Sequence, residues 1–413
     1  MIAAPIAPEQ LGGGARRLSS LSRMAIAFLV GAILGWIAWG RGEELVSLLA
    51  IAGLPLAWGH TSSRWDASSL MAGYFGAGAR GLPHGAVVFF GDQAPAWCGV
   101  AMWAAVVAVL CVPYALGWAR HGASRGLGFA VATLACAVPP FGLLGWLNPL
   151  SMAGVMFPAW GWVGLVLGLA ALACVAARSL RATGAIAALA VGANLMAGHA
   201  QAAPARWQGF DTSFAKLSSA GTEYASQLLA SMKRINWLVG VINDMPRDAV
   251  LILPETVLGR LDGVEETMLS QAELILAAKH SRVIVGAELG RGTQYANTAV
   301  VLGAGVGEDR AAVQGIPVPI SMWKPWADDG AKADLLARGN TITVLGKRVG
   351  VSVCYEQLLT YSLLRLAMDK PEVLAAVSNV WWASSTNIPT IQAQSVRAYA
   401  RLFDIPVVFA RNI

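Results

Sequence analysis

Long apolar runs fill residues 24–200, and they limit the folds open to this chain more than any other feature of the sequence. A helix that crosses a bilayer needs about 20 mostly apolar residues. The run at 69–90 contains Arg80, Pro83 and His84, so a re-entrant or broken helix is the alternative there. We expect a polytopic α-helical membrane domain of about six or seven transmembrane helices. The candidate spans are roughly 24–40, 45–59, 69–90, 98–118, 127–147, 152–176 and 183–200.

The arginine residues around these runs indicate how the helices are oriented. If the tail of residues 1–23 is cytoplasmic, the outer loops hold only Arg41, beside Glu43 and Glu44. The inner loops hold Arg16, Arg17, Arg23, Arg64, Arg120, Arg125, Arg178 and Arg181. This bias follows the positive-inside rule. An odd number of spans then places residues 201–413 on the far side of the membrane, whereas dropping the weak third run would place them in the cytoplasm.

Composition separates the two parts of the chain. The whole chain is 56% hydrophobic and 13% charged, with a mean hydropathy of +0.56, but most of the apolar excess lies before residue 200. Residues 201–413 carry charges every few positions, as an ordinary α/β domain does. The arginines of the inner loops account for the net charge of +6, so we expect no direct nucleic-acid binding.

Residues 201–413 contain alternating strand and helix patterns. Short apolar runs bounded by turn residues predict strands at 248–253, 282–286, 297–302, 341–345, 348–353, 373–377 and 406–410, and helical patterns include 357–368 and 391–403. The alternation predicts a layered α/β domain. Functional residues in such domains gather just past the carboxyl ends of strands. Glu255, Cys354 and Asn379 occupy positions of this kind.

Cys354 is the only cysteine in this second part of the chain. The other cysteines, Cys98, Cys111, Cys136 and Cys174, lie in the apolar runs. Cys354 is therefore either a small buried side chain or a nucleophile. A thiol has an ordinary pKa of about 8.5 and needs a base, usually histidine, but this part of the chain offers only His280. One cysteine and one histidine cannot supply four zinc ligands, so we expect no metal and no organic cofactor.

Glu255 and Lys324 offer another way to activate Cys354. Glu255 follows an apolar strand, which favours a partly desolvated carboxylate with a raised pKa that can act as a base. Lys324 lies between Trp323 and Trp326, which would shield its ammonium group, and the ammonium can stabilise developing negative charge. Each residue alone also has a plainer interpretation, as a turn residue, a surface lysine or a core cysteine.

These residues occur in the order and spacing of a known family. Over about residues 204–412 the sequence resembles the nitrilase superfamily of carbon–nitrogen hydrolases, in Leu253-Pro-Glu255, Trp323-Lys324, Val353-Cys-Tyr-Glu356, Val377-Ser-Asn379 and Trp381-Trp382. The resemblance implies an α-β-β-α sandwich, with helices outside two sheets. It also implies a Glu–Lys–Cys triad in which Glu255 is the base, Cys354 the nucleophile and Lys324 the group that stabilises the oxyanion.

The same resemblance implies a covalent mechanism and supporting residues. A thioacyl-enzyme would form on Cys354 and be resolved by water or by an amine. Tyr355 and Glu356 would orient the site, with Glu356 on the same side as Cys354 if the chain stays extended. The candidate residues of the substrate pocket are Trp323, Trp326, Asn379 and Trp382.

Two branches of this superfamily carry membrane spans before the nitrilase domain. The apolipoprotein N-acyltransferase family acylates bacterial lipoproteins from a phospholipid donor. Its glutamate eight residues after the lysine is replaced here by Lys332, with Asp328 or Asp329 as candidate substitutes. The chain also stops at Ile413, short of that family's closing strands and C-terminal span, so it is either truncated or an incomplete sandwich. The sequence is more similar to the TraB conjugal-transfer family, in Met322-Trp-Lys-Pro-Trp326, Cys354-Tyr-Glu-Gln-Leu-Leu359 and Asn379-Val-Trp-Trp-Ala383.

The resemblance implies a multi-pass enzyme of the bacterial inner membrane, with the nitrilase-like domain of residues 201–413 in the periplasm. We expect an amidase or acyltransferase that acts in conjugal plasmid transfer. The expected partners are the lipid bilayer, a phospholipid acyl donor and proteins of the conjugation pilus or mating channel. A lipoprotein N-acyltransferase and a non-catalytic component of the mating apparatus are the alternatives.

Overall fold

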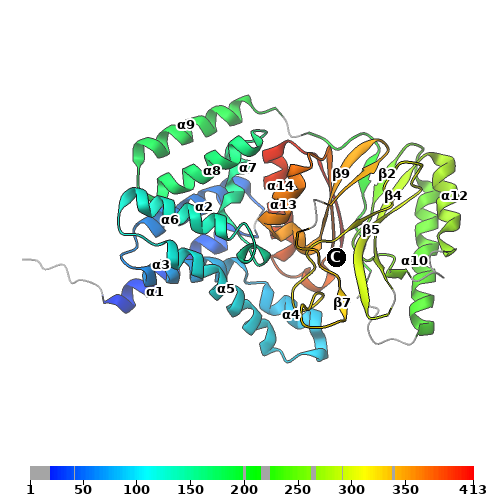
Figure 1. Cartoon of the computed structure of the whole chain (residues 1–413), viewed down its shortest axis with the longest axis horizontal. Coiled ribbons are helices and arrows are strands. Elements are labelled where there is room, and N and C mark those ends of the chain that lie inside the picture. The colour runs from blue at the N-terminus through cyan, green and yellow to red at the C-terminus, as the bar shows by residue number, and fades with distance from the viewer. Residues whose placement is uncertain are drawn as a thin grey trace, which may run out of the picture.

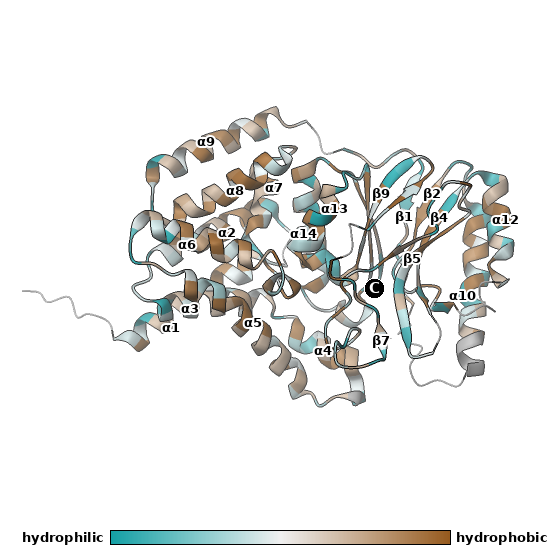
Figure 2. Cartoon of the chain, in the orientation of Figure 1, coloured by the Kyte–Doolittle hydropathy of each residue, from teal (hydrophilic) through white to brown (hydrophobic). Residues whose placement is uncertain are grey.

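A helical half and a two-sheet half follow one another along the chain (Figure 1). The computed structural model describes residues 19–40, 42–198, 201–214, 224–261, 267–290, 292–336 and 340–413. The last helix of the first half ends at Met196, and the first strand begins at Trp207. Figure 2 shows that the helical half is the more apolar of the two.

The described part of the helical half contains α1 (Ser20–Ala38), α2 (Glu44–Gly59), α3 (Arg64–Gly78), α4 (Leu82–Phe90), α5 (Trp97–Gly117), α6 (Gly122–Ala135), α7 (Met152–Met156), α8 (Gly161–Ala176) and α9 (Leu180–Met196). Short 3-10 helices lie at η1 (Gly91–Gln93), η2 (Phe141–Leu143) and η3 (Pro149–Ser151). By length and composition, α1 and α5 could cross a membrane. Helices α2, α8 and α9 are apolar but only 16 or 17 residues long.

These lengths do not confirm a polytopic membrane domain with six or seven spans, since two of the described helices meet the full length requirement. The predicted run 69–90 is divided between α3 and α4, because the chain turns after α3 and Pro83 lies in the first turn of a new helix. The run 127–147 yields α6, which has 14 residues and ends before Pro139 and Pro140. The broken-helix alternative for 69–90 is confirmed, and the remaining spans stay predictions.

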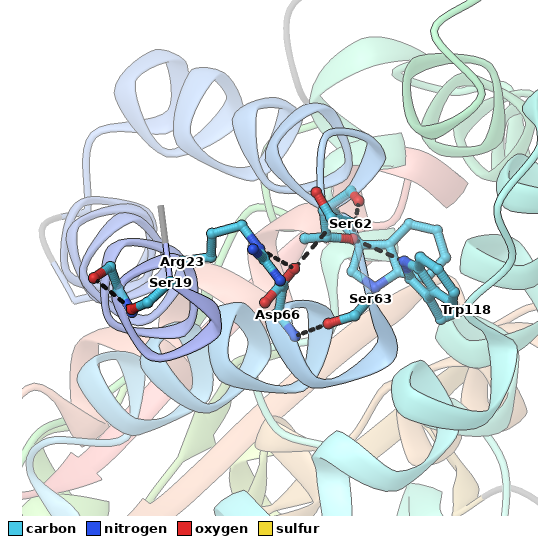
Figure 3. Close-up of polar contacts among 9 residues, drawn as sticks. Ser19, Arg23, Ser62, Ser63, Asp66 and Trp118 are labelled. Carbon is cyan, nitrogen blue, oxygen red and sulfur yellow. Dashed lines mark hydrogen bonds and ion pairs between the residues drawn. The ribbon is translucent and has the colours of Figure 1, made fainter. Parts of the chain in front are cut away.

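Polar loops meet at the end of the helical half that is far from the sheets (Figures 1 and 3). The Arg23 Nε of α1 lies 3.5 Å from the Asp66 carboxylate of α3, and the backbone N–H of Ser62 donates to the same carboxylate at 3.2 Å. The Trp118 indole N–H donates to the Thr61 hydroxyl at 2.9 Å. The start of α1, the loop before α3 and the loop after α5 are therefore joined at this end.

The second half contains β1 (Trp207–Gly209), β2 (Val250–Ile252), β3 (Arg260–Leu261), β4 (Arg282–Leu289), β5 (Gln294–Leu302), β6 (Ala311–Val313), β7 (Gly330–Ala331), β8 (Thr341–Val344), β9 (Lys347–Val353), β10 (Val373–Asn379) and β11 (Val407–Asn412). Its helices are α10 (Tyr224–Asp244), α12 (Ser270–Lys279), η4 (Cys354–Leu358), α13 (Thr360–Met368), η5 (Trp381–Ala383) and α14 (Ile388–Phe403). The strands predicted from apolar runs are confirmed within a few residues.

The strands form two sheets. The larger sheet has the order β1-β2-β4-β5-β6, with β3 also beside β4 and β7 beside β5, and the smaller has the order β11-β10-β9-β8. Strands β1, β2 and β4 run parallel in the first sheet, as do β9, β10 and β11 in the second. The predicted hairpin is the antiparallel pair β8 and β9. Parallel strands of one sheet align their carboxyl ends, so residues that follow β9 and β10 lie side by side, and the packing of the two sheets brings the end of β2 to them.

Three apolar cores separate four layers. Ile252 and Ile284 of the larger sheet pack against Val351 and Val377 of the smaller sheet. Helices α10 and α12 cover the outer face of the larger sheet, and α13 and α14 cover the smaller sheet, where Val396 is fully buried. The α-β-β-α sandwich implied by the resemblance is therefore present. Figure 1 shows α13 and α14 between the smaller sheet and the helical half.

Helix α14 attaches the sandwich to the helical half through polar and apolar contacts. The Gln394 amide donates to the Ala38 carbonyl at 2.8 Å, and the Asn387 amide donates to the Gly78 carbonyl at 2.8 Å. Arg401 forms a 2.5 Å ion pair with Glu44. Residues of α7 and α9 share an apolar core with α13 and α14. The layer of helices beside the smaller sheet is therefore fixed against the helical half.

Candidate active site

Cys354 stands at the junction of a buried strand and a turn. It directly follows β9, whose Val349, Val351 and Val353 are fully buried, and it begins η4. Its φ is +44°, which turns the chain out of the strand at a residue that rarely adopts this conformation. The residue is 6% exposed. The strand therefore holds the thiol at its carboxyl end, as predicted.

Glu255 approaches Cys354 from the other sheet. It follows β2 and is 3% exposed. The Asn297 amide donates to its Oε1 at 2.6 Å, and the Asn379 backbone N–H donates to its Oε2 at 2.9 Å. Both oxygens of the carboxylate are therefore held, and Asn379 contributes from the end of β10. The site lies where strand ends of the two sheets converge.

Burial dominates the electrostatics of this pair. Desolvation raises the pKa of Glu255 above its ordinary value, although contacts with Cys354, Asn297 and Asn379 act in the opposite direction. Desolvation, followed by the nearby Glu255 carboxylate, raises the pKa of the Cys354 thiol well above its ordinary value. The thiol is therefore protonated at rest beside a carboxylate that can accept its proton. A cation close to the sulfur would favour that transfer.

Lys324 does not supply that cation in this structure. Its Nζ forms a 2.8 Å ion pair with Asp329, and the two side chains are 33% and 50% exposed. Within the described residues, no hydrogen bond or ion pair joins Lys324 to Glu255 or Cys354. The sequence offered Asp328 and Asp329 as substitutes for the acyltransferase glutamate whose position Lys332 occupies. Asp329 is thus the partner of Lys324 in this structure. Trp326 is 69% exposed and the Lys324 side chain is 33% exposed, so the ammonium group is only partly shielded from water.

Glu356 links the cysteine turn to the segment that carries Lys324. The chain does not stay extended after Cys354, because η4 folds Glu356 back toward Val353, so the condition for placing Glu356 on the same side as Cys354 is not met. Its Oε2 accepts from the Val353 backbone N–H at 3.2 Å, and its Oε1 accepts from the N–H groups of Gly315 and Ile316 at 3.0 and 3.1 Å. Burial raises the pKa of Glu356 to about 7.

Tyr355 docks the cysteine turn on the helical half. Its hydroxyl donates to the Leu143 carbonyl of η2 at 2.7 Å, and its ring lies 6.1 Å from the Trp146 ring, measured between centroids. The residue directly after the nucleophile candidate is therefore held by the loop between α6 and α7. This position supports the site without bringing the phenol hydroxyl to Cys354.

Asn379 and Trp382, two candidate pocket residues, have different positions. The side chain of Asn379 is occupied, since its amide donates to Thr256 at 2.7 Å and its carbonyl accepts from Asn412 at 2.8 Å. Only its backbone N–H reaches Glu255. The Trp382 indole N–H donates to the backbone carbonyl of Asn379 at 3.1 Å. The centroid of its ring lies 5.8 Å from that of Phe89 in α4. Trp323, the fourth candidate, is half-buried in the Lys324 segment.

Two proteins resemble the chain over almost its whole length. A probable conjugal transfer protein TraB from Sinorhizobium fredii is 32% identical over 397 residues, which cover 94% of this chain and 97% of that protein. A conjugal transfer protein TraB from Agrobacterium fabrum is 32% identical over 413 residues, which cover 94% and 93%. This chain belongs to the TraB family of conjugal transfer proteins. No family profile matches the chain.

The solved structures that match this TraB-family chain are distant from it. A cysteine-to-alanine mutant of the Nesterenkonia AN1 amidase, from the nitrilase superfamily, has 10% identity and a TM-score of 0.35, over 50% of this chain and 74% of the amidase. A second mutant of that amidase, with acrylamide added at its active-site cysteine, has 11% identity and a TM-score of 0.34. These values are too low to add to the topology described above.

Two amides at the site escaped sequence-based prediction. Asn297 orients Glu255 from β5, and the only signal for it was the polar strand entry Tyr295-Ala-Asn-Thr298. Gln392 of α14 donates to the Cys354 carbonyl at 2.9 Å and lies 3.9 Å from its sulfur. The only signal for Gln392 in the sequence was a polar side chain on the buried face of α14. Among the described residues, no three His, Cys, Asp or Glu side chains form a metal-binding group.

Proposed function

We propose that this TraB-family protein is a membrane-anchored amidase or acyltransferase that acts in conjugal plasmid transfer through a thioacyl-enzyme. The observation that carries the proposal is the buried contact between Glu255 and Cys354 at converging strand ends. A lone core cysteine needs no carboxylate beside it, and placing both groups out of water costs free energy. A carboxylate held by two donors next to a thiol is the arrangement that base-assisted nucleophilic attack requires.

The proposed reaction has two halves. Glu255 accepts the thiol proton as the Cys354 sulfur bonds to an acyl carbonyl carbon, and the carbonyl oxygen becomes an oxyanion. Collapse of this intermediate breaks the bond to the leaving group, which takes the proton from Glu255 and leaves a thioacyl-enzyme. Water or an amine then attacks the thioacyl carbon, gives a proton to Glu255, and the cysteine leaves as the reprotonated thiol.

Lys324 is the proposed electrostatic partner of the oxyanion. It would need to leave Asp329 and enter the site when substrate binds. The Lys324–Asp329 pair is partly exposed, so water can replace much of its attraction and its release costs little. Glu356 holds the start of this segment at Gly315 and Ile316. Once the pair with Asp329 has broken, movement of the segment beyond this point would deliver the ammonium group.

The distribution of charge favours a periplasmic sandwich attached to the inner membrane. Arg125 of α6 donates to the carbonyls of Gly59 and Ala119, so the arginine-bearing loops gather at the end of the helical half opposite the sandwich (Figure 1). Basic loops face the cytoplasm. The sandwich would then lie on the other side, beside phospholipid that could donate an acyl group and near pilus or mating-channel proteins that could accept it.

Intact-mass measurement of the detergent-purified protein tests the proposal, with wild type beside Cys354→Ala. We expect an acyl adduct on wild type alone. The adduct is either present after purification or formed when an activated acyl ester is supplied to the protein. The same adduct on Cys354→Ala would reject Cys354 as the nucleophile. Cys174→Ala is a matched control, since Cys174 lies in α8 away from the sandwich site.

A non-catalytic component of the mating apparatus is the second candidate. Two observations favour it, because Cys354 is only 6% exposed and Lys324 is paired outside the site. Plasmid transfer from donor cells that carry Cys354→Ala distinguishes the two functions. Undiminished transfer at normal protein levels would support the non-catalytic role, whereas loss of transfer supports the enzyme.

A further inference from the structure

A second carboxylate, Glu288, lies on the same face of the larger sheet as the site. In β4, Val285 and Ala287 pack toward the outer helices, whereas Ile284 packs between the sheets. Strand alternation places Glu288 on the face between the sheets with Ile284. A Cβ at Gly286, on that same face, would collide with the backbone of Glu255. Glu288 is therefore two residues along the strand from the point where Glu255 crosses it.

The neighbouring strands place Glu288 beside groups that already serve the site. Its partner across the antiparallel pair is Asn297, the residue that donates to Glu255. Arg260 of β3 is its partner on the other side, but the guanidinium donates to the carbonyls of Gly290 and Gly292, at 3.2 and 2.5 Å. No hydrogen bond or ion pair within the described residues engages the Glu288 carboxylate.

The electrostatics agree with this position. Burial, and to a lesser degree the charge of Glu255, raise the pKa of Glu288 to about 7, while Arg260 and Arg234 oppose the rise. Burial, and after it the charge of Glu288, raises the pKa of Tyr295, two residues before Asn297 on β5. The side chain is partly exposed. A half-buried carboxylate whose acceptor capacity is unused is suited to a ligand that brings a hydrogen-bond donor or a positive charge.

We propose that Glu288 binds the ammonium group of a primary-amine acceptor and removes its proton, so that an amine resolves the thioacyl-enzyme in preference to water. This inference rests on the proposed function. The ammonium gives one proton to Glu288 and becomes a neutral amine, whose nitrogen bonds to the thioacyl carbon. Glu255 takes a second proton from that nitrogen and passes it to the Cys354 sulfur as the carbon–sulfur bond breaks. Glu288 then releases its proton to water, which completes the balance.

Partitioning of the acyl-enzyme tests this assignment. The full-length protein in detergent is acylated with p-nitrophenyl butyrate, and the products of water, glycinamide and hydroxylamine are measured at neutral pH. Glycinamide is largely an ammonium ion there, because α-amino groups have a pKa of about 8, whereas hydroxylamine is largely neutral. In Glu288→Gln we expect the glycinamide-to-water product ratio to fall about tenfold, the scale of one lost charge-assisted hydrogen bond.

Two internal comparisons separate binding from general damage. The release of p-nitrophenolate and the hydroxylamine-to-water ratio should stay within about twofold of wild type, since neither involves the ammonium. Glu288→Asp, which keeps the charge, should retain most of the preference for glycinamide. Glu372→Gln is the matched control, because Glu372 pairs with Lys347 on the surface.

The possible failures are distinguishable. An unchanged glycinamide ratio in Glu288→Gln, or an equal loss for glycinamide and hydroxylamine, would overturn the role of Glu288. If Glu288→Gln releases no p-nitrophenolate, Glu288→Asp decides, and a lost preference there despite normal acylation also overturns it. Absence of p-nitrophenolate release from wild type, or its survival in Cys354→Ala, would instead reject the proposed function and this inference with it.

Discussion

The two sheets hold Glu255 and Cys354, whereas a surface segment holds Lys324. Glu255 is 3% exposed and Cys354 6% exposed, and strand ends and buried amides position both. Lys324 is paired with Asp329 at 2.8 Å on the partly exposed side of its segment. The proposed triad is therefore one preassembled pair and one separate cation. The sheets hold Glu255 and Cys354, which must be desolvated. The surface segment carries Lys324, which needs only its charge.

The difference also concerns free energy. A buried polar pair is expensive to disturb, because each group has lost water and depends on its protein donors. An exposed ion pair contributes little, since water and salt screen it. Substitutions at the pair should therefore act on the chemistry of the thiol itself, and substitutions in the segment should act only where an oxyanion develops. The following predictions test that division.

Cys354→Ala should have the largest effect. Removal of the nucleophile should lower turnover of p-nitrophenyl butyrate by at least about a thousandfold, because a covalent intermediate can no longer form. Ester turnover measured by absorbance, normalised to folded protein, checks this. Cys174→Ala in α8 should keep wild-type turnover. Comparable turnover in Cys354→Ala would mean that the sheet-held pair is not the reactive centre.

Glu255→Gln should reduce the rate of acylation about 10²- to 10⁴-fold, the usual contribution of a positioned base. Since the pKa of Glu255 is raised by burial, the base is ionised only above that raised value. The wild-type rate should therefore fall as the pH is lowered through it, at a pH above the ordinary range of glutamate, and the fall should disappear in Glu255→Gln. A pH–rate profile of p-nitrophenolate release measures both effects. Glu273→Gln, on the outer helix α12, should keep the wild-type profile.

Lys324→Ala should separate the two regions. Loss of an oxyanion-stabilising group should slow acylation by about 10²- to 10³-fold. Alkylation of Cys354 by iodoacetamide forms no oxyanion, so its rate should change by less than about twofold. Lys332→Ala, in the same segment, is the matched control and should affect neither rate. Equal losses in acylation and alkylation would show that Lys324 acts on the thiol, and the division would fail.

Sequence reasoning succeeded where chemistry follows local pattern. The apolar run before Glu255 and the alternating strand before Cys354 predict two strand ends, and the packing of the two sheets against each other brings these ends together. It failed where contacts span the chain. Asn297 is 42 residues from Glu255, and Gln392 is 38 residues from Cys354, so no local pattern pairs them. The φ of +44° at Cys354 is likewise imposed by the surroundings rather than by a preference of cysteine.

The helical half shows the same limit in another form. The apolar runs predict where helices form, and Pro83 explains the break between α3 and α4. Hydropathy does not specify helix length, which the loops decide, and α6 has 14 residues where a longer run was predicted. The contacts of Gln394 and Asn387 with the ends of α1 and α3 depend on the docked sandwich, which no apolar run encodes.

Glu356→Gln should give the smallest effect, and it acts on stability rather than on chemistry. Burial raises the pKa of Glu356 from 4.5 to about 7 in the folded state, so folding favours the protonated form. That contribution is fully present below pH 4.5 and is lost as the pH rises through about 7, a change of about 3 kcal/mol in the free energy of unfolding. The melting temperature of wild type should therefore fall over this window.

In Glu356→Gln this fall should become shallower, because glutamine stays neutral at every pH. A residual slope of the same sign should persist, since the pKa of Glu288 is raised to about 7 as well. Melting in detergent from pH 4.5 to pH 8 measures the slope, with Glu372→Gln as the surface control. Parallel curves for wild type and Glu356→Gln would mean that Glu356 is solvated. The Glu356 carboxylate, which joins the Cys354 turn to the Lys324 segment, would then behave as an exposed group like Lys324. It would not behave as a buried group like Glu255 and Cys354.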